Sequence, residues 1–134
     1  MATGYPDFTR VTRPTRQITG PDQLRWYWSG YYDLAADTAV TITLATLESD
    51  ERLFIPFAGC SRIGTVAAPS RFTLMDDSYL AGRVAFDRNA ILNPGGDAPY
   101  DFAPEHVVKV QIINYDLATA FRYYYFLWGV LQYE

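Results

Sequence analysis

The chain has 134 residues, which is the size of one domain and too short for two ordinary ones. Hydrophobic residues make up 49% of it and charged residues 19%, so a globular protein is expected and wholesale disorder is not expected. The net charge is −4 and the chain has a single lysine. Because nucleic-acid binding relies on clustered positive charge, we do not expect nucleic acid as a partner.

The first twenty residues contain Gly4, Pro6, Pro14 and Gly20 and show no helical apolar period, which predicts an extended N-terminal arm over residues 1–20. The rest, residues 21–134, is expected to form one domain. Residues 1–25 carry a charge of +2, which leaves −6 for the remainder. The arm is therefore either a segment that lies on an acidic surface or a solvated basic tail.

Several runs with period-two alternation or β-rich composition predict strands. The first half of the chain holds strands at Gln23–Leu34, interrupted near Gly30, at Thr38–Leu47, and at Arg52–Ala58, where Pro56 favours an edge position. The acidic turn between the last two predicts that they form a hairpin.

The second half continues the pattern. Further strands are expected at Cys60–Val66, Arg71–Met75, Tyr79–Phe86 and Val107–Ile113. Residues 78–92 are alternatively long enough for one short helix, and Asn89–Pro104, with three prolines and a glycine pair, predicts a long loop.

The last fourteen residues, Phe121–Glu134, form a strand-like run that is apolar and aromatic on both alternating sets. A turn before it predicts a C-terminal hairpin with Val107–Ile113. One set, including Tyr123 and Tyr125, can serve the domain's own core. The other contains Tyr124, Phe126, Trp128 and Val130 and needs a neighbouring sheet or a second copy of the chain to cover it.

Seven or eight short strands in one domain predict an all-β fold, an antiparallel β-sandwich with jelly-roll or immunoglobulin-like topology and an extended N-terminal arm.

No residue set identifies a reaction. His106 is the only histidine, which excludes most triads and zinc sites, and a pair with Cys60, the only cysteine, lacks any nucleophile context. Five loop carboxylates offer oxygen ligands to calcium without the spacing of a calcium loop: Asp76, Asp77, Asp97, Asp101 and Glu105. We therefore expect no catalytic residue, bound metal or cofactor, and a protein that is not an enzyme.

An aromatic cluster at Trp26, Trp28, Tyr31 and Tyr32 raises an alternative function, a carbohydrate or small-ligand binding module. Alternation divides this cluster between two strand faces, so half of it is expected in the core.

The start of the chain has no charged segment followed by an apolar one, and no run approaches the roughly twenty apolar residues of a membrane span. We expect neither secretion by that route nor a membrane partner. A single cysteine fits folding in the cytoplasm.

The opening G-Y-P-D-F-T-R at Gly4–Arg10, before a compact β body that ends in an aromatic strand, resembles small structural proteins of tailed bacteriophage particles. The resemblance implies a capsid cement or decoration protein, or a small tail component, made in the host cytoplasm and located in the virion. Its expected partners are itself, as a homo-oligomer, and other virion proteins such as a major capsid or tail protein. The expected protein-interface residues come from the arm and the last strand: Tyr5, Phe8, Arg10, Arg13, Arg16, Tyr124, Phe126 and Trp128.

Overall fold

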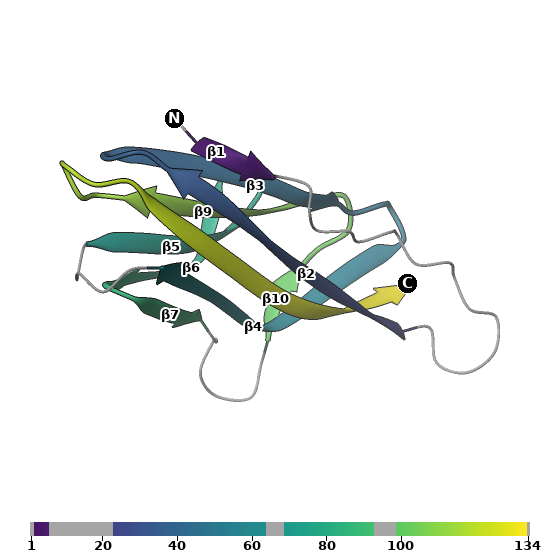
Figure 1. Ribbon diagram of the computed structural model, residues 1–134. Coiled ribbons are helices and arrows are strands. Elements are labelled where there is room, and N and C mark those ends of the chain that lie inside the picture. Colours follow the sequence, from purple (N-terminus) through teal and green to yellow (C-terminus); the bar gives the residue numbers. More distant parts are fainter. Residues whose placement is uncertain (1, 6–22, 64–68, 93–98, 134) are drawn as a thin grey trace.

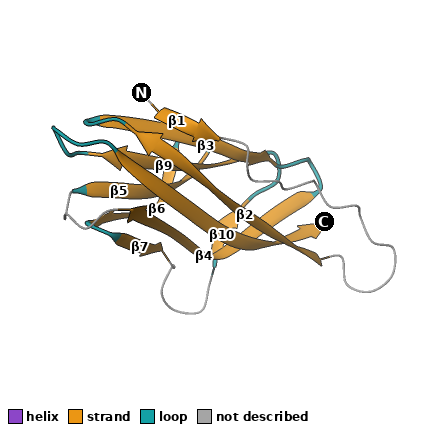
Figure 2. Ribbon diagram, viewed as in Figure 1, coloured by secondary structure: helices purple, strands orange, loops and turns teal. Residues whose placement is uncertain are grey.

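The computed structural model describes residues 2–5, 23–63, 69–92 and 99–133. Within these ranges every regular element is a β-strand and there is no helix (Figure 2). The all-β class is confirmed. The helix considered for residues 78–92 is wrong, because β6 (Tyr79–Phe86) and β7 (Asn89–Leu92) occupy that segment.

The strands form two antiparallel sheets (Figure 1). Sheet A has the order β1 (Ala2–Tyr5), β2 (Gln23–Leu34), β10 (Phe121–Tyr133), β4 (Glu51–Ile63) and β7. A short strand, β8 (Tyr100–Phe102), also pairs with β4, but with residues other than those that pair with β7. Sheet B has the order β3 (Thr38–Thr46), β9 (Val107–Asn114), β5 (Ser70–Asp76) and β6.

The pairing of these strands is nested. β2 pairs β10, β3 pairs β9, β4 pairs β7, and β5 pairs β6, as if one long antiparallel hairpin were rolled up across two sheets. This is the jelly-roll arrangement. The immunoglobulin-like alternative is excluded because the first long strand, β2, lies beside the last strand, β10, in the middle of sheet A.

The core lies between the sheets and follows the predicted alternation. Val108, Val110 and Ile112 of β9 are fully buried, as expected for their set. The inner set of β10 is also buried and includes Tyr123 and Tyr125. Each sheet therefore supplies one apolar face to a common core.

Both predicted hairpins are wrong. β3 pairs β9 in sheet B, whereas β4 lies in sheet A. Likewise β9 lies in sheet B and β10 in sheet A. A short connection between two alternating strands is equally compatible with a hairpin and with a crossing from one sheet to the other, and here the chain crosses.

The edge position predicted for Pro56 is also wrong, because β4 has β10 on one side and β7 and β8 on the other. Pro56 lies where β4 changes partner from β8, which pairs Leu53–Ile55, to β7, which pairs Ala58–Ser61. On the β10 side the register shifts at the same place. A proline is tolerated there because the missing N–H falls at a bulge.

Several predicted boundaries are corrected as well. The short strand expected from Cys60 is the continuation of β4, which runs to Ile63, and the expected loop at residues 89–104 contains β7 and β8. Of the expected arm, residues 2–5 form β1 and pair antiparallel with β2. Residues 6–20 lie outside the described residues, so the arm and its boundary stay predictions.

Candidate functional site

The second set of β10 side chains faces away from the core on the outside of sheet A. Tyr124 is 40% exposed and Phe126 is 42% exposed, and Trp128 and Val130 are partly buried. One face of this strand therefore lies in the core, as predicted, and the other lies on the surface and not against a second sheet of the described residues.

The strands on both sides of β10 extend this surface. Tyr31 of β2 lies directly opposite Tyr124, with ring centroids 5.6 Å apart. The ring of Phe57 of β4 lies 5.6 Å from that of Phe126. Tyr27, which is 62% exposed, lies opposite Trp128. Directly opposed residues on neighbouring strands share a face. We call this surface the outer aromatic face: Tyr27, Tyr31, Phe57, Tyr124, Phe126 and Trp128.

A glycine sets the position of one ring in this face. Gly59 of β4 lies opposite Phe126, and a Cβ atom added to it would lie only 2.5 Å from the Phe126 ring. The ring therefore rests directly on the backbone of β4, which flattens the face at its centre.

A charged pair borders the face near Tyr31. Arg122 donates two hydrogen bonds to Asp33, from Nε to Oδ1 at 2.6 Å and from Nη2 to Oδ2 at 2.9 Å. Its guanidinium carbon lies 4.3 Å from the centroid of the Tyr31 ring. The hydrogen bond from Arg122 lowers the pKa of the Asp33 carboxyl, and the same bond raises the pKa of Arg122. Arg122 thus holds Asp33 ionised beside an aromatic ring.

Part of the face is hollowed. A shallow cavity of about 360 Å³ is lined by Ser29, Gly30, Tyr31, Tyr124, Tyr125 and Phe126. Its lining is mostly apolar. Gly30 does not interrupt the register between β2 and β10. It leaves room for the Tyr125 side chain, whose hydroxyl oxygen lies 2.8 Å from where a Cβ atom would be.

The predicted interface residues are only partly described. Tyr124, Phe126 and Trp128 lie together on the outer aromatic face. Tyr5 belongs to β1, but its side chain is outside the described residues, as are Phe8, Arg10, Arg13 and Arg16. Their role in an interface stays a prediction.

Sequence reasoning missed Tyr27, Phe57 and the position of Tyr31 next to Tyr124. The proposed aromatic cluster is divided as expected: Trp28 and Tyr32 are in the core and Tyr31 is on the outside, while the side chain of Trp26 is not described. Alternation alone predicts only that Tyr27 lies on the other face of its strand from Trp28. Only the pairing of β2 with β10 shows that it joins the same surface.

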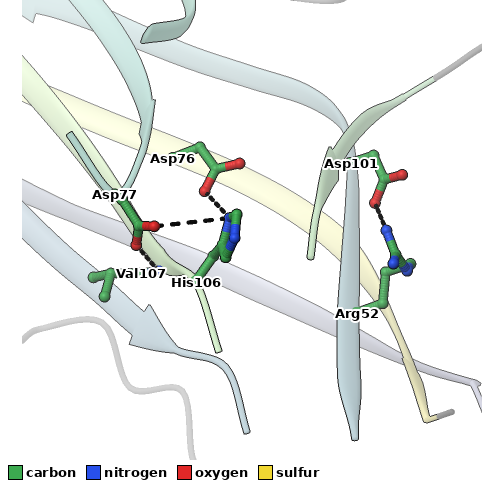
Figure 3. Close-up of polar contacts among 6 residues, drawn as sticks. All are labelled: Arg52, Asp76, Asp77, Asp101, His106 and Val107. Carbon is green, nitrogen blue, oxygen red and sulfur yellow. Dashed lines mark hydrogen bonds and ion pairs between the residues drawn. The ribbon is translucent and has the colours of Figure 1, made fainter. Parts of the chain in front are cut away.

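The two residues considered for nucleophilic catalysis lie in different environments. Cys60 is buried in sheet A between Tyr125 and Ala90, and burial raises the pKa of its thiol. His106 lies in the loop before β9, where its ring contacts Asp76 and Asp77 (Figure 3). A buried thiol with a raised pKa has little thiolate, the form that reacts.

Within the described residues, the carboxylates considered for calcium do not form one group. Asp101 pairs with Arg52, Asp76 and Asp77 face His106, Glu105 is exposed, and Asp97 lies outside the described residues (Figure 3). The described part of the chain also contains no helix that is long and apolar enough to cross a membrane.

No protein-family model and no curated protein matches the sequence. Similar solved structures include the CBM36-1 domain of a multidomain xylanase from the hindgut metagenome of Trinervitermes trinervoides. The sequence identity is 10%, the TM-score is 0.45, and the match covers 96% of this chain and 94% of that one. They also include the acidic stable capsid structure of Helicobacter pylori bacteriophage KHP30, with 8% identity, a TM-score of 0.44, and coverage of 80% and 92%. The decameric BFDV capsid protein shares 12% identity at a TM-score of 0.41, over 82% of this chain and 98% of that one. Similarities of this size do not transfer a function to this chain.

Proposed function

We propose that the chain is a non-enzymatic structural protein of a virion, a capsid cement or decoration protein or a small tail component, which self-associates and binds neighbouring virion subunits. The observation that carries the self-association is the outer aromatic face, where six aromatic side chains from three adjacent strands gather on the outside of sheet A.

The composition of this face fits a protein interface. Tyrosine, tryptophan, phenylalanine and arginine are enriched at the centre of such interfaces, and lysine is depleted. Here the aromatic rings are bordered by the Arg122–Asp33 pair, and no lysine lies on β2, β4 or β10. An apolar centre with a charged border is the arrangement of a docking surface.

The occupant that fits best is the same face of a second copy. The face spans a sheet, and two sheets pack against each other through side chains that interdigitate. A two-fold arrangement pairs this surface with itself and makes each contact twice, so the charged and tyrosine side chains of one copy can meet different side chains of the other. Repetition on a particle surface would strengthen modest contacts through effective concentration.

The assignment to a virion is supported by the sequence opening Gly4–Arg10 and by the size and all-β class of the chain. It implies synthesis in a host cytoplasm and contact with a major capsid or tail protein. In particles purified from the source that encodes the chain, mass spectrometry should detect it in many copies; its absence from such particles would exclude the virion assignment.

Self-association is tested by light scattering on the full-length chain and on a double variant, Tyr124→Ser with Phe126→Ser. Both side chains are partly exposed, so the fold should tolerate the change. The matched control is Leu117→Ser, which removes another exposed apolar side chain, 81% exposed, from the loop before β10. A version lacking residues 1–20 tests the arm in the same experiment.

The unchanged chain and the Leu117→Ser control should form the same oligomer. The double variant should have a dissociation constant at least about tenfold higher, because a few central aromatic residues dominate such interfaces. A monomer at every concentration would contradict self-association through this face. An oligomer that survives the double variant but not loss of the arm would move the interface to residues 1–20.

A carbohydrate or small-ligand binding module is the second candidate, and the hollow between Tyr31, Tyr124 and Phe126 favours it. Aromatic rings beside a fixed Asp–Arg pair can stack on a sugar and hydrogen-bond its hydroxyls. This function predicts a monomer that binds an oligosaccharide on a glycan array, with binding lost in Tyr31→Ala. An oligomer without glycan binding would exclude it.

A further inference from the structure

The tight turn between β5 and β6 and the loop before β9 bring three side chains together at one end of sheet B (Figure 3). Nδ1 of His106 lies 2.7 Å from Oδ1 of Asp76 and 3.8 Å from Oδ2 of Asp77. One ligand atom from each of the three residues lies within 4.8 Å of the other two. The only histidine of the chain thus meets two consecutive carboxylates.

The backbone holds this cluster in place. The N–H of Asp77 donates to the carbonyl of Val107 at 2.8 Å, and the N–H of Val107 donates to Oδ1 of Asp77 at 2.7 Å. Asp77 has a positive φ of 55°, which turns the chain tightly at this point. One oxygen of Asp77 is therefore occupied by the backbone, and the other points toward His106.

The backbone of His106 is fixed as well. Its N–H donates to the carbonyl of Ala103 at 3.2 Å, and its carbonyl accepts from the N–H of Leu47 at 2.9 Å. Ligands carried by backbone that is pinned on both sides need little ordering when an ion binds.

The charge at the cluster is negative. Among the described residues neither Asp76 nor Asp77 makes an ion pair with an arginine or lysine, and His106 is their charged partner only when it is protonated. Glu105 directly precedes His106 in the sequence and adds an exposed acidic residue to the same loop. The site attracts a cation.

We propose that Asp76, Asp77 and His106 bind a divalent first-row transition metal such as Zn²⁺, with water in the remaining positions. The imidazole nitrogen decides the class of ion, because nitrogen ligands favour zinc and its neighbours whereas calcium and magnesium prefer oxygen alone. Three protein ligands with an open position are a common zinc arrangement.

The distances require only small movements. Ligand atoms about 2.0–2.2 Å from a tetrahedral metal lie roughly 3.3–3.6 Å from one another. The His106–Asp76 pair at 2.7 Å must open by less than an ångström, and the His106–Asp77 pair at 3.8 Å must close slightly. All three side chains are only partly buried, so they can make these adjustments.

Binding needs the lone pair of Nδ1. A proton on Nδ1 therefore relocates through solvent to Nε2, so that the ring stays neutral, and the Nδ1 lone pair forms the bond to the metal. The ion would then link the β5–β6 turn to the start of β9, and it would stabilise the folded chain because the unfolded chain lacks the preformed site.

The test is titration of the untagged full-length chain with ZnCl₂ by calorimetry, with thermal unfolding measured in parallel. We expect one zinc ion per chain and a higher melting temperature with zinc. His106→Gln and Asp77→Asn should each weaken binding at least about tenfold. Asparagine keeps the oxygen that accepts from Val107, so this variant loses a metal ligand without losing the turn.

The matched control is Asp101→Asn, which removes a loop carboxylate that pairs with Arg52 outside the cluster (Figure 3). It should bind zinc as the unchanged chain does. Because His106 is the only histidine, the ¹⁵N signals of its ring can be followed in the unchanged chain, and Nδ1 should shift on addition of zinc.

Three results would overturn the site: no binding at zinc concentrations up to about 1 mM, binding that survives both cluster variants, or an imidazole signal that zinc leaves unmoved. Equal binding of magnesium or calcium that does not need His106 would also overturn it, because it would show an acidic surface that attracts any divalent cation. Should a variant fail to fold, the imidazole signal of the unchanged chain decides.

Discussion

Gly129 lies in β10 at the point where its register with β4 shifts. A Cβ atom added there would lie 2.9 Å from the backbone oxygen of Phe54 and 3.0 Å from Cδ1 of Leu53. Backbone cannot move aside as a side chain can, so the close approach of the two strands at the bulge depends on glycine.

The first prediction is that Gly129→Ala lowers the free energy of unfolding by about 1–3 kcal/mol, the usual cost of overpacking a tight site. Urea unfolding followed by tryptophan fluorescence measures it. Gly59→Ala is the matched control: the atoms in its way belong to the partly exposed Phe126 ring, which can swing toward solvent. A Gly129→Ala variant as stable as Gly59→Ala would contradict this account of the bulge.

Individual side chains were predictable where alternation is strict. Val110 and Tyr125 are buried and Tyr124 is exposed, as their positions in alternating runs indicate. The bulge opposite Gly129 was not predictable, because it depends on the partner strand. The contact of His106 with Asp76 was not predictable either, since it requires β5 to lie beside β9.

At the scale of elements, the existence of most strands could be predicted from the sequence, whereas their partners could not. The sequence predicts strands at Thr38–Leu47 and Arg52–Ala58, but either sheet could have taken each of them. The alternation within one strand predicts that Tyr124, Phe126 and Trp128 share a surface. It does not predict that Tyr27 and Phe57 belong to the same surface, because this depends on the pairing of β2 and β4 with β10.

Asn114 connects elements of the two sheets. It is fully buried at the end of β9, and its Nδ2 donates to the carbonyls of Ala35 at 3.1 Å and Thr119 at 2.9 Å. Its Oδ1 accepts from the N–H of Asp116 at 3.0 Å. One side chain therefore ties the end of β9 to the turn after β2 and to the loop that leads into β10.

The second prediction is that Asn114→Ala lowers the free energy of unfolding by about 2–4 kcal/mol, because it removes the hydrogen-bond partner of three partly buried backbone groups, those of Ala35, Asp116 and Thr119. Asn89→Ala is the control, since the hydrogen bond between Ser61 and Asn89 is exposed and its loss should cost within about 0.5 kcal/mol. Chemical denaturation of both variants gives the comparison. Equal stability of the two would show that Asn114 is not a link between the sheets.

At the scale of the whole molecule, the nested pairing makes the last strand central. β10 pairs β2 from Phe121 to Gln132 and β4 from Arg122 to Tyr133, so it is the interior strand that joins the two halves of sheet A. The same strand contributes one face to the core and the other to the outer aromatic face. Folding must therefore bring the two ends of the domain together, which is slow for a topology with so few local pairings.

The third prediction is that a chain ending at Ala120 has no cooperative unfolding transition. Loss of β10 would separate β2 from β4 in sheet A. It would also expose buried core side chains of these two strands, including Trp28, Leu53 and Ile55. Removal of residues 1–5 is the control. It deletes β1, an edge strand that pairs only β2, and should leave a single cooperative transition. Differential scanning calorimetry of both truncated chains shows whether each has a cooperative transition. A cooperative transition in the chain without β10 would contradict the prediction, because it would show that the fold does not depend on its last strand.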